Sequence, residues 1–322
     1  MPHIFRVPTG HIIKINGSKG KKLECLSIGD YGKSQNIKAD FLGHTSPIQG
    51  VEHGELLPLS EKWVITISTQ YGCSMGCKFC DVPKVGPGIN ASFEDLEAQV
   101  DAALALHPEV THTDRLNLHY ARMGEPTFNP AVLYHAFMMK HFKQGTVHPV
   151  VSTMLPKRNK DLSYYLMLWC LIKNKDYDGE AGLQFSINST DNEQRNWMFN
   201  NNSLSLETIS EIGKELPPPV GRKYTLNFAV TKDTILDGKR LQELFSPDKF
   251  IVKITPIHDT SASKLNSLNT PEGYTEYTPY EPFEYQAKDV GGFDTLVFIP
   301  SREEDESRIT CGNALLADET EE

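Results

Sequence analysis

The sequence lacks a long apolar run. Its longest hydrophobic stretches are far shorter than the roughly 20 apolar residues that a membrane-spanning helix requires. Residues 1–6 also lack the basic segment followed by an apolar one that is typical of a secretory signal. Low-complexity segments and internal repeats are absent too. We therefore expect a globular, cytoplasmic protein that has no membrane partner.

Positive charge is scarce as well. The 322 residues include 32 Lys and Arg against 42 Asp and Glu, which gives a formal net charge of −10. Because phosphate contacts are made by Lys and Arg, this balance argues against extensive electrostatic binding of nucleic acid. Part of the acid lies in two runs, at residues 303–306 and 318–322, so a locally basic substrate groove remains compatible with the total.

Cysteine is infrequent, and half of it is concentrated in one stretch. Of six cysteines, Cys73, Cys77 and Cys80 lie together in the spacing C-x3-C-x2-C. Three thiolates this close can converge on one inorganic cluster, and a [4Fe-4S] cube bound by three cysteines leaves one iron open to an outside ligand. The small residues Gly72 and Gly76 let the backbone fold around such a cluster. The stretch therefore predicts an oxygen-sensitive [4Fe-4S] site.

The remaining cysteines bear on the alternatives. No second C-x2-C or C-x4-C pair occurs, so a structural zinc site would lack the fourth Cys or His that such sites usually take. A disulfide framework is disfavoured because the three clustered cysteines are too close to pair with one another, and the other three are distant in sequence. We interpret Cys25 and Cys170 as small buried hydrophobic residues. Zinc stays open as the alternative to a cluster.

Hydrophobic periodicity predicts an α/β fold. Short β-branched strands are expected at 64–68, 116–120, 150–153, 183–187, 224–230 and 250–254, with a last candidate at 293–299. Helices are expected between them, at about 92–104, 129–142, 162–172, 191–199, 205–216 and 237–246. Six such repeats imply a parallel sheet, either a barrel or an open doubly wound sheet, whose reactive residues gather in the loops after the strands.

The chain divides into two parts of different character. Residues 1–50 are expected to form a small β-rich lead-in, with strand candidates at 10–15, 23–28 and 37–41. Residues 51–322 are expected to form the α/β domain, which ends in an acidic tail. A stretch rich in Ser, Thr, Asn and Pro, from about 256 to 282, predicts a long active-site or covering loop.

Several motifs together resemble one family. The cysteine stretch resembles the signature of radical S-adenosylmethionine (SAM) enzymes, and Met123-Gly124-Glu125-Pro126 looks like the G-E-P element that holds the amino group of SAM. Ser152-Thr153, the stretch from Phe185 to Asn188 and the late pair Cys311-Gly312 follow in register. In order and spacing, residues 50 to 318 resemble the RlmN/Cfr family, which are adenine methyltransferases of ribosomal and transfer RNA.

The resemblance implies a partial (β/α)6 radical SAM barrel with a small β-rich amino-terminal extension, and two cofactors, a [4Fe-4S] cluster and SAM. It assigns the cluster to Cys73, Cys77 and Cys80, and SAM binding to Gly124, Glu125, Ser152, Ser186, Asn188 and His258. In that family the late cysteine, here Cys311, is methylated by one SAM. A second SAM is cleaved to a 5′-deoxyadenosyl radical, which activates the S-methyl group for addition to an sp2 ring carbon. Expected partners are SAM, a one-electron reductant such as flavodoxin or ferredoxin, and an RNA or nucleotide-like substrate.

The sequence also departs from the family pattern. Thr66 stands where the family has a second cysteine, which resolves the covalent RNA adduct by forming a disulfide. The family's amino-terminal accessory domain for RNA is absent or replaced by the lead-in. His258 aligns with an expected Asn, and His53 lies near the position of an expected Glu. The only spare thiols are Cys25 and Cys170, and both are poor candidates for this role, although Cys25 is the better one. We therefore favour an enzyme that ends its reaction differently from the family over one in which another cysteine replaces the missing thiol.

Three hypotheses follow. The first is a radical SAM methyltransferase that acts on an sp2 carbon of a nucleic-acid base or a related heterocycle. The second is a radical SAM enzyme on the same scaffold that performs non-methylating chemistry on a small molecule or peptide. The third is a non-catalytic metal-binding protein that keeps the fold.

Overall fold

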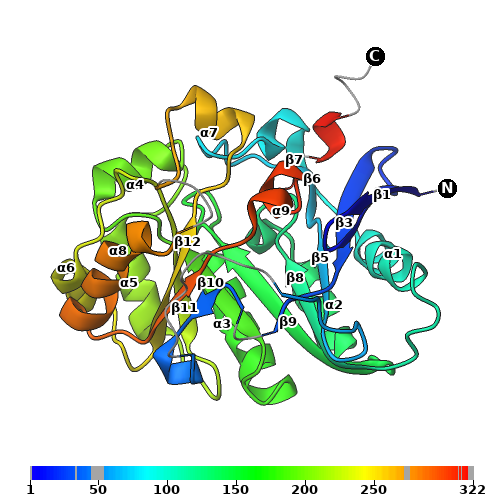
Figure 1. Ribbon diagram of the computed structural model, residues 1–322, viewed down its shortest axis with the longest axis horizontal. Coiled ribbons are helices and arrows are strands. Elements are labelled where there is room, and N and C mark those ends of the chain that lie inside the picture. Colours follow the sequence, from blue (N-terminus) through cyan, green and yellow to red (C-terminus); the bar gives the residue numbers. More distant parts are fainter. Residues whose placement is uncertain are drawn as a thin grey trace.

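The computed structural model describes residues 2–32, 35–44, 54–271, 276–310, 312 and 314–317. Its centre is a sheet of parallel strands with helices packed against it (Figure 1). In order across the sheet, these strands are β5 (Trp63–Ile67), β8 (Thr113–Tyr120), β9 (Gly145–Thr153), β10 (Gly182–Ser186), β11 (Tyr224–Val230), β12 (Phe250–Pro256) and β13 (Thr295–Phe298). The predicted α/β class and parallel sheet are confirmed, and β13 extends the sheet beyond the six expected repeats.

Antiparallel strands from the lead-in extend this sheet at both edges. β1 (His3–Val7), β2 (Gly10–Asn16) and β3 (Lys22–Ile28) form a meander, and β3 pairs with β5. β4 (Ile37–Lys38) pairs with β13 at the far edge, which gives an 11-stranded sheet within the described residues. The strand predicted at 37–41 is shorter than expected because the chain turns into a 3-10 helix at Asp40–Leu42.

The helices predicted between the strands are all present. They are α1 (Phe93–Leu104), α2 (Ala131–Met139), α3 (Leu162–Leu171), α4 (Asn192–Met198), α5 (Leu206–Glu215) and α6 (Gly238–Leu244). α1 begins where expected, because the Ser92 hydroxyl accepts from the Asp95 N–H and the Asp95 carboxylate accepts from the Ser92 N–H. None of the described helices is both long enough and apolar enough to cross a membrane.

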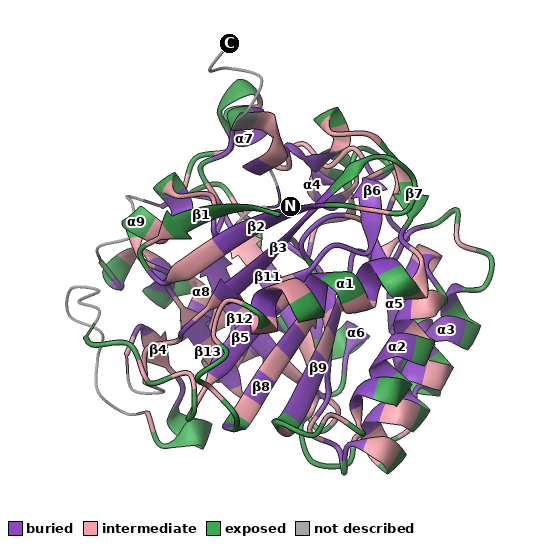
Figure 2. Cartoon of the chain, turned by 90° about the vertical axis from the view of Figure 1, so that its right-hand side faces the viewer, coloured by how far each residue is buried: buried purple, intermediate pink, exposed green. Residues whose placement is uncertain are grey.

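The two faces of the sheet differ in polarity. Along β8, Leu116, Leu118 and Tyr120 are fully buried, and the Tyr120 hydroxyl lies 2.7 Å from Nδ1 of His135 on α2, so this face is covered by helices. The alternating residues Asn117 and His119 are only partly buried and lie on the opposite face. Figure 2 shows buried strands, with exposed residues on the outer sides of α2 and α3. The inner face is therefore the polar one.

Some elements differ from the sequence-based expectation. β9 starts at Gly145, so Pro149 lies inside the strand and not at its start. This position is tolerable because pairing with β10 begins only at Val150, which leaves Pro149 with a single strand neighbour. The stretch at 256–282 is not one continuous loop. Short elements that were not predicted are β6 (Gln70–Gly72), β7 (Pro87–Asn90), α7 (Ser261–Leu265), α8 (Glu281–Tyr285) and α9 (Arg302–Glu306).

Candidate active site

The cysteine loop leaves the carboxyl end of β5 and is enclosed by the β6–β7 hairpin. The Cys73 N–H donates to the Gly86 carbonyl oxygen, 3.0 Å away. Gly72 has a φ of +77°, and a Cβ placed there would lie 2.1 Å from the same oxygen, so this crossing requires glycine. Both Figure 1 and Figure 2 place this hairpin and α7 at the same end of the sheet. The loop therefore lies at the edge where reactive residues of parallel sheets gather.

The three cysteines are partly buried in an apolar wall. The Cys77 sulfur lies 3.4 Å from the Met154 sulfur, and the Phe79 ring packs edge-on against Phe199 with centroids 5.6 Å apart. Burial raises the pKa of Cys73 to about 12 and holds the pKa of Cys77 well above its usual value. Both groups are therefore neutral thiols at pH 7 without a metal, and metal binding must release their protons.

Three cysteine thiolates are the donor set that a [4Fe-4S] cluster with one open iron takes. Among the residues that the structure describes, no three Cys, His, Asp or Glu side chains converge on one metal ion. In a [4Fe-4S] cube each thiolate binds a different iron, so such convergence is not required. A buried cation lies close by: Arg195 is fully buried, its charge acts on Cys77, and its Nε has no hydrogen-bond partner in the described part of the chain. A cation held in this way suits an anionic thiolate cluster.

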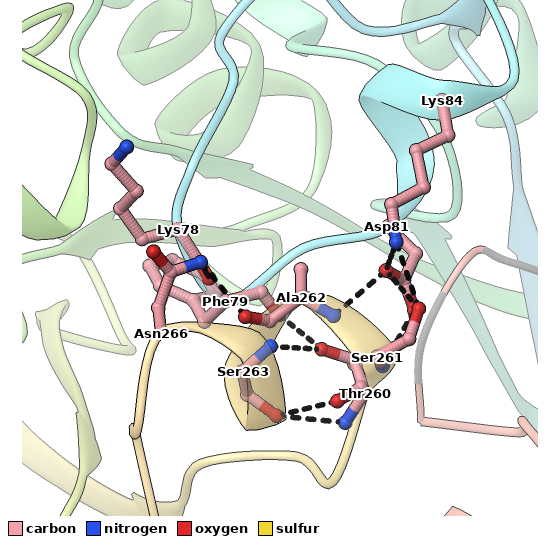
Figure 3. A network of polar contacts seen from close by, with 9 residues as sticks. All are labelled: Lys78, Phe79, Asp81, Lys84, Thr260, Ser261, Ala262, Ser263 and Asn266. Atoms are coloured by element: carbon pink, nitrogen blue, oxygen red, sulfur yellow. Dashed lines mark hydrogen bonds and ion pairs between the residues drawn. The ribbon is translucent and has the colours of Figure 1, made fainter.

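The end of the cysteine loop forms hydrogen bonds with α7 (Figure 3). This short helix was not predicted from the sequence. The buried Asp81 carboxylate accepts from the N–H of Ser261 at 3.0 Å, its hydroxyl at 2.7 Å and the N–H of Ala262 at 2.9 Å. The Thr260 hydroxyl donates to the Phe79 carbonyl oxygen at 2.9 Å. These bonds hold the loop after Cys80 against the segment that follows β12.

Glu125 follows β8 and is buried beside the cysteine loop. One carboxylate oxygen accepts from the Thr127 N–H at 3.1 Å and its hydroxyl at 2.8 Å, and the other accepts from the Met154 N–H at 3.0 Å. Burial raises its pKa, and these hydrogen bonds oppose the shift. Within the described residues, no Lys, Arg or His forms an ion pair with this carboxylate, while its charge acts on Cys73 and Cys77. A cationic ligand group would complete this environment.

The other residues assigned to SAM lie along the same edge. Gly124 has a φ of +97°, and a Cβ there would lie 2.5 Å from the Gln70 side chain. Ser152 is the register partner of Gln184, and Ser186 is two residues further along β10, so both serines lie on the polar inner face. Asn188 is buried, with its side-chain oxygen accepting from the Ala229 N–H at 3.1 Å. The structure therefore brings these four positions to the carboxyl edge.

His258 is engaged with the carboxyl-terminal segment. Its Nδ1 lies 3.2 Å from the Asp305 carboxylate, which also accepts from the Asp259 N–H at 2.7 Å. Burial alone would raise the pKa of Asp305, but the His258 contact and these hydrogen bonds hold it well below its usual value. Cys311 and His53 lie outside the described residues.

Comparison with known proteins gives the following relatives. No family model matches the chain. The chain is 26% identical over 210 residues to the dual-specificity RNA methyltransferase RlmN of Syntrophotalea carbinolica, covering 63% of this chain and 52% of that protein. It is 23% identical over 254 residues to RlmN of Sorangium cellulosum, covering 78% of this chain and 61% of that protein. The chain thus spans between half and two thirds of the length of these curated relatives.

A solved radical SAM methyltransferase from Sphaerobacter thermophilus has the same fold. The match has a TM-score of 0.64 at 17% identity and covers 92% of this chain and 76% of that chain. The predicted partial radical SAM barrel with a β-rich amino-terminal extension is confirmed by this likeness. The RlmN relatives confirm the resemblance to the RlmN/Cfr family that the motifs indicated.

Proposed function

We propose that the chain is a radical SAM enzyme, and that it is a methyltransferase acting on an sp2 carbon of a nucleic-acid base or a related heterocycle. The observation that carries this proposal is the pairing of two features at one sheet edge. The loop of Cys73, Cys77 and Cys80 lies beside Glu125, a buried carboxylate whose charge acts on Cys73 and Cys77 and which has no ion-pair partner among the described residues. The RlmN relatives and the shared fold support the methyltransferase assignment.

Each group at the edge has a defined task in this proposal. Cys73, Cys77 and Cys80 bind the cluster as thiolates, and Arg195 offsets part of the negative charge that this creates. Glu125 accepts a hydrogen bond from the ammonium of SAM, while Ser152, Ser186 and Asn188 line the pocket on the inner face. The bound cluster and SAM supply a 5′-deoxyadenosyl radical, with an electron from a reductant such as flavodoxin or ferredoxin. We keep the expected cytoplasmic location, because free thiols persist in a reducing compartment.

The inner face also supports an anionic or nucleotide-like substrate. Lys253 and His119 are partly buried on this face, and each feels the positive charge of Arg222. Burial lowers the pKa of Lys253 to about 8 and that of His119 to about 3. The lowered pKa leaves His119 neutral at pH 7, so the positive charge near this face comes from Lys253 and Arg222, in a protein whose net charge is −10. RNA, the substrate class named for the relatives, fits as a small structured element or fragment.

Thr66 favours a second candidate function. Because a hydroxyl cannot replace a thiol in disulfide formation, an enzyme with Thr66 on β5 fits non-methylating radical chemistry on a small molecule or peptide as well. Mass spectrometry of peptides containing Cys311 separates the two candidates, since only the methyltransferase carries an S-methyl group there after incubation with SAM.

The test of the enzyme assignment is anaerobic reconstitution with iron and sulfide, followed by SAM and dithionite. We expect a brown protein that forms 5′-deoxyadenosine. Ala variants of Cys73, Cys77 and Cys80 should lose both the chromophore and this product, whereas Cys170→Ala, a buried cysteine on α3, should keep them. A colourless wild-type protein with one tightly bound zinc and no 5′-deoxyadenosine would show a non-catalytic metal-binding protein.

A further inference from the structure

The segment that flanks Cys311 is seated on the lead-in. Ile309 and Ala314, on either side of this cysteine, are buried in a small apolar cluster with Ile12 of β2 and Leu26 of β3. Gly312 fits closely against the barrel, because a Cβ placed there would lie 2.0 Å from the Arg122 carbonyl oxygen and 3.1 Å from the Val82 side chain. Val82 comes two residues after the last cysteine of the cluster loop. The segment therefore lies at the carboxyl edge of the sheet.

A buried arginine binds the backbone before Cys311. Arg122 follows β8, and its Nη1 donates to the Ile309 carbonyl oxygen at 2.7 Å, while Nη2 donates to the Arg308 carbonyl oxygen at 2.8 Å. Its Nε lies 2.7 Å from Oε1 of Glu24 on β3. This contact is an ion pair and not a hydrogen bond, because the N–H does not point at the oxygen. Both side chains are buried, at 2% and 0% exposure. The planar guanidinium thus joins the lead-in to the carboxyl-terminal segment.

The same glutamate binds the backbone after Cys311. Oε2 of Glu24 accepts from the Leu315 N–H at 2.8 Å, at the start of the 3-10 helix Ala314–Ala317. One carboxylate therefore holds Leu315 directly and positions the arginine that holds Arg308 and Ile309. Residue 311 lies between these attached residues in the sequence.

We propose that the Glu24–Arg122 pair is a positioning device that holds the segment bearing Cys311 at the carboxyl edge of the barrel. The inference rests on the proposed function for the role of Cys311, but the attachment itself does not. It gives the lead-in a part in the chemistry: β3 supplies the carboxylate that binds Leu315 and the arginine that binds Arg308 and Ile309, on either side of Cys311 in the sequence. Neither residue touches substrate in this scheme, and both act through the segment.

The attachment is tested by hydrogen exchange of a peptide covering residues 308–316, in wild type, Arg122→Gln and Glu24→Gln. We expect exchange to be faster by about tenfold or more in both variants, because the carbonyl and amide attachments are lost. Glu284→Gln is the matched control, since it breaks the partly buried Lys38–Glu284 pair at the far edge of the sheet and should leave this peptide unchanged. If Arg122→Gln fails to fold, Arg122→Lys is tested instead. Lysine keeps the positive charge but cannot bind two carbonyl oxygens with one planar group, so the exchange rate should be intermediate.

The chemical role is tested on the same proteins after anaerobic incubation with SAM and dithionite. We expect less S-methyl on Cys311 per iron bound, with 5′-deoxyadenosine formation per iron bound kept. Wild-type exchange in both variants, or wild-type methylation in a variant whose peptide exchanges faster, would overturn the positioning role. A wild-type protein without 5′-deoxyadenosine or methyl on Cys311 would refute the proposed function, and the exchange measurement would still decide the attachment.

Discussion

Replacing Glu125 by Gln is expected to weaken SAM binding while the fold survives. The substitution keeps an oxygen that can accept from the N–H and hydroxyl of Thr127, which now bind one carboxylate oxygen at 3.1 and 2.8 Å. The amide nitrogen then faces the Met154 N–H, which loses its acceptor at 3.0 Å. The negative charge that would bind the SAM ammonium is removed.

The structure allows both effects to be estimated. An unsatisfied Met154 N–H costs about 1–3 kcal/mol, and removing a buried charge offsets part of it, so we expect the apo protein to lose about 2 kcal/mol or less. A hydrogen bond to a charged group is worth about 1.5–3 kcal/mol, which corresponds to roughly a 10- to 100-fold weaker SAM affinity. Because a loss of about 2 kcal/mol leaves most of the protein folded, the loss of stability alone would not weaken SAM binding.

The assay is equilibrium binding of SAM to anaerobically reconstituted proteins with equal iron content. Thr127→Val is the matched control, because it removes one donor to Glu125 and keeps the charge, so its SAM affinity should change by about threefold or less. Affinity of Glu125→Gln within the same narrow range would refute the assigned role, since the carboxylate would then be only a structural acceptor for Thr127 and Met154.

Three further predictions concern other parts of the molecule. Asp81→Ala should lower the free energy of unfolding by about 2 kcal/mol in urea titrations, because three donors at α7 lose their acceptor. An unchanged urea midpoint would contradict a stabilising role for the hydrogen bonds in Figure 3. Burial lowers the pKa of Lys253 from 10.5 to about 8 in the folded protein. The charged side chain therefore lowers the free energy of unfolding below pH 8, and this cost disappears as the pH rises toward 10.5. Lys253→Met should raise the free energy of unfolding by about 3 kcal/mol at pH 7, and the gain should shrink toward pH 10. Binding to long RNA should be weak and vary little with salt because of the net charge of −10, and tight binding with a steep salt dependence would count against it.

The parts of the fold that sequence could predict are those with local periodicity. β11 matches its expected range of 224–230, because alternation and β-branched residues mark it along the chain itself. The capping box at Ser92 was likewise visible in four consecutive residues. By contrast, β6 and β7 are too short for a period, and their antiparallel pairing in the fold shows them to be a hairpin.

The parts of the site that sequence could not predict depend on partners far apart in the chain. The cysteine spacing and the Gly-Glu-Pro motif are local, so they could be identified directly. The attachments of Asp81 to Ser261 and of Arg122 to Ile309 join residues 180 and 187 positions apart. Nothing in the vicinity of either residue in the sequence indicates the partner, because the fold alone brings them together. The sequence shows only an Asp directly after the last cysteine and a Thr-Ser pair at the start of α7, neither of which identifies its partner.

The fold separates Thr66 from Cys25, the nearest spare cysteine along the sheet. Thr66 on β5 pairs in register with Leu26 of β3 and His119 of β8, so its side chain shares the inner face with His119. Cys25 is the neighbour of Leu26 and lies on the opposite face, where its sulfur donates to the Gln99 carbonyl oxygen of α1 at 3.5 Å. Burial raises its pKa to about 12, so it is not a thiolate at neutral pH.

We therefore predict that no relocated thiol resolves the adduct. Cys170 is no better placed, since it is buried on α3 outside the sheet with a pKa raised by burial to about 11. Turnover with the true substrate should give the same products in wild type, Cys25→Ala and Cys170→Ala, with no disulfide to Cys311 in non-reducing peptide maps. Thr66→Cys places a thiol on the inner face and should introduce such a disulfide. A protein–substrate adduct that accumulates in Cys25→Ala but not in wild type would mean that Cys25 reaches the site after all, which would require β3 to leave its pairing with β5.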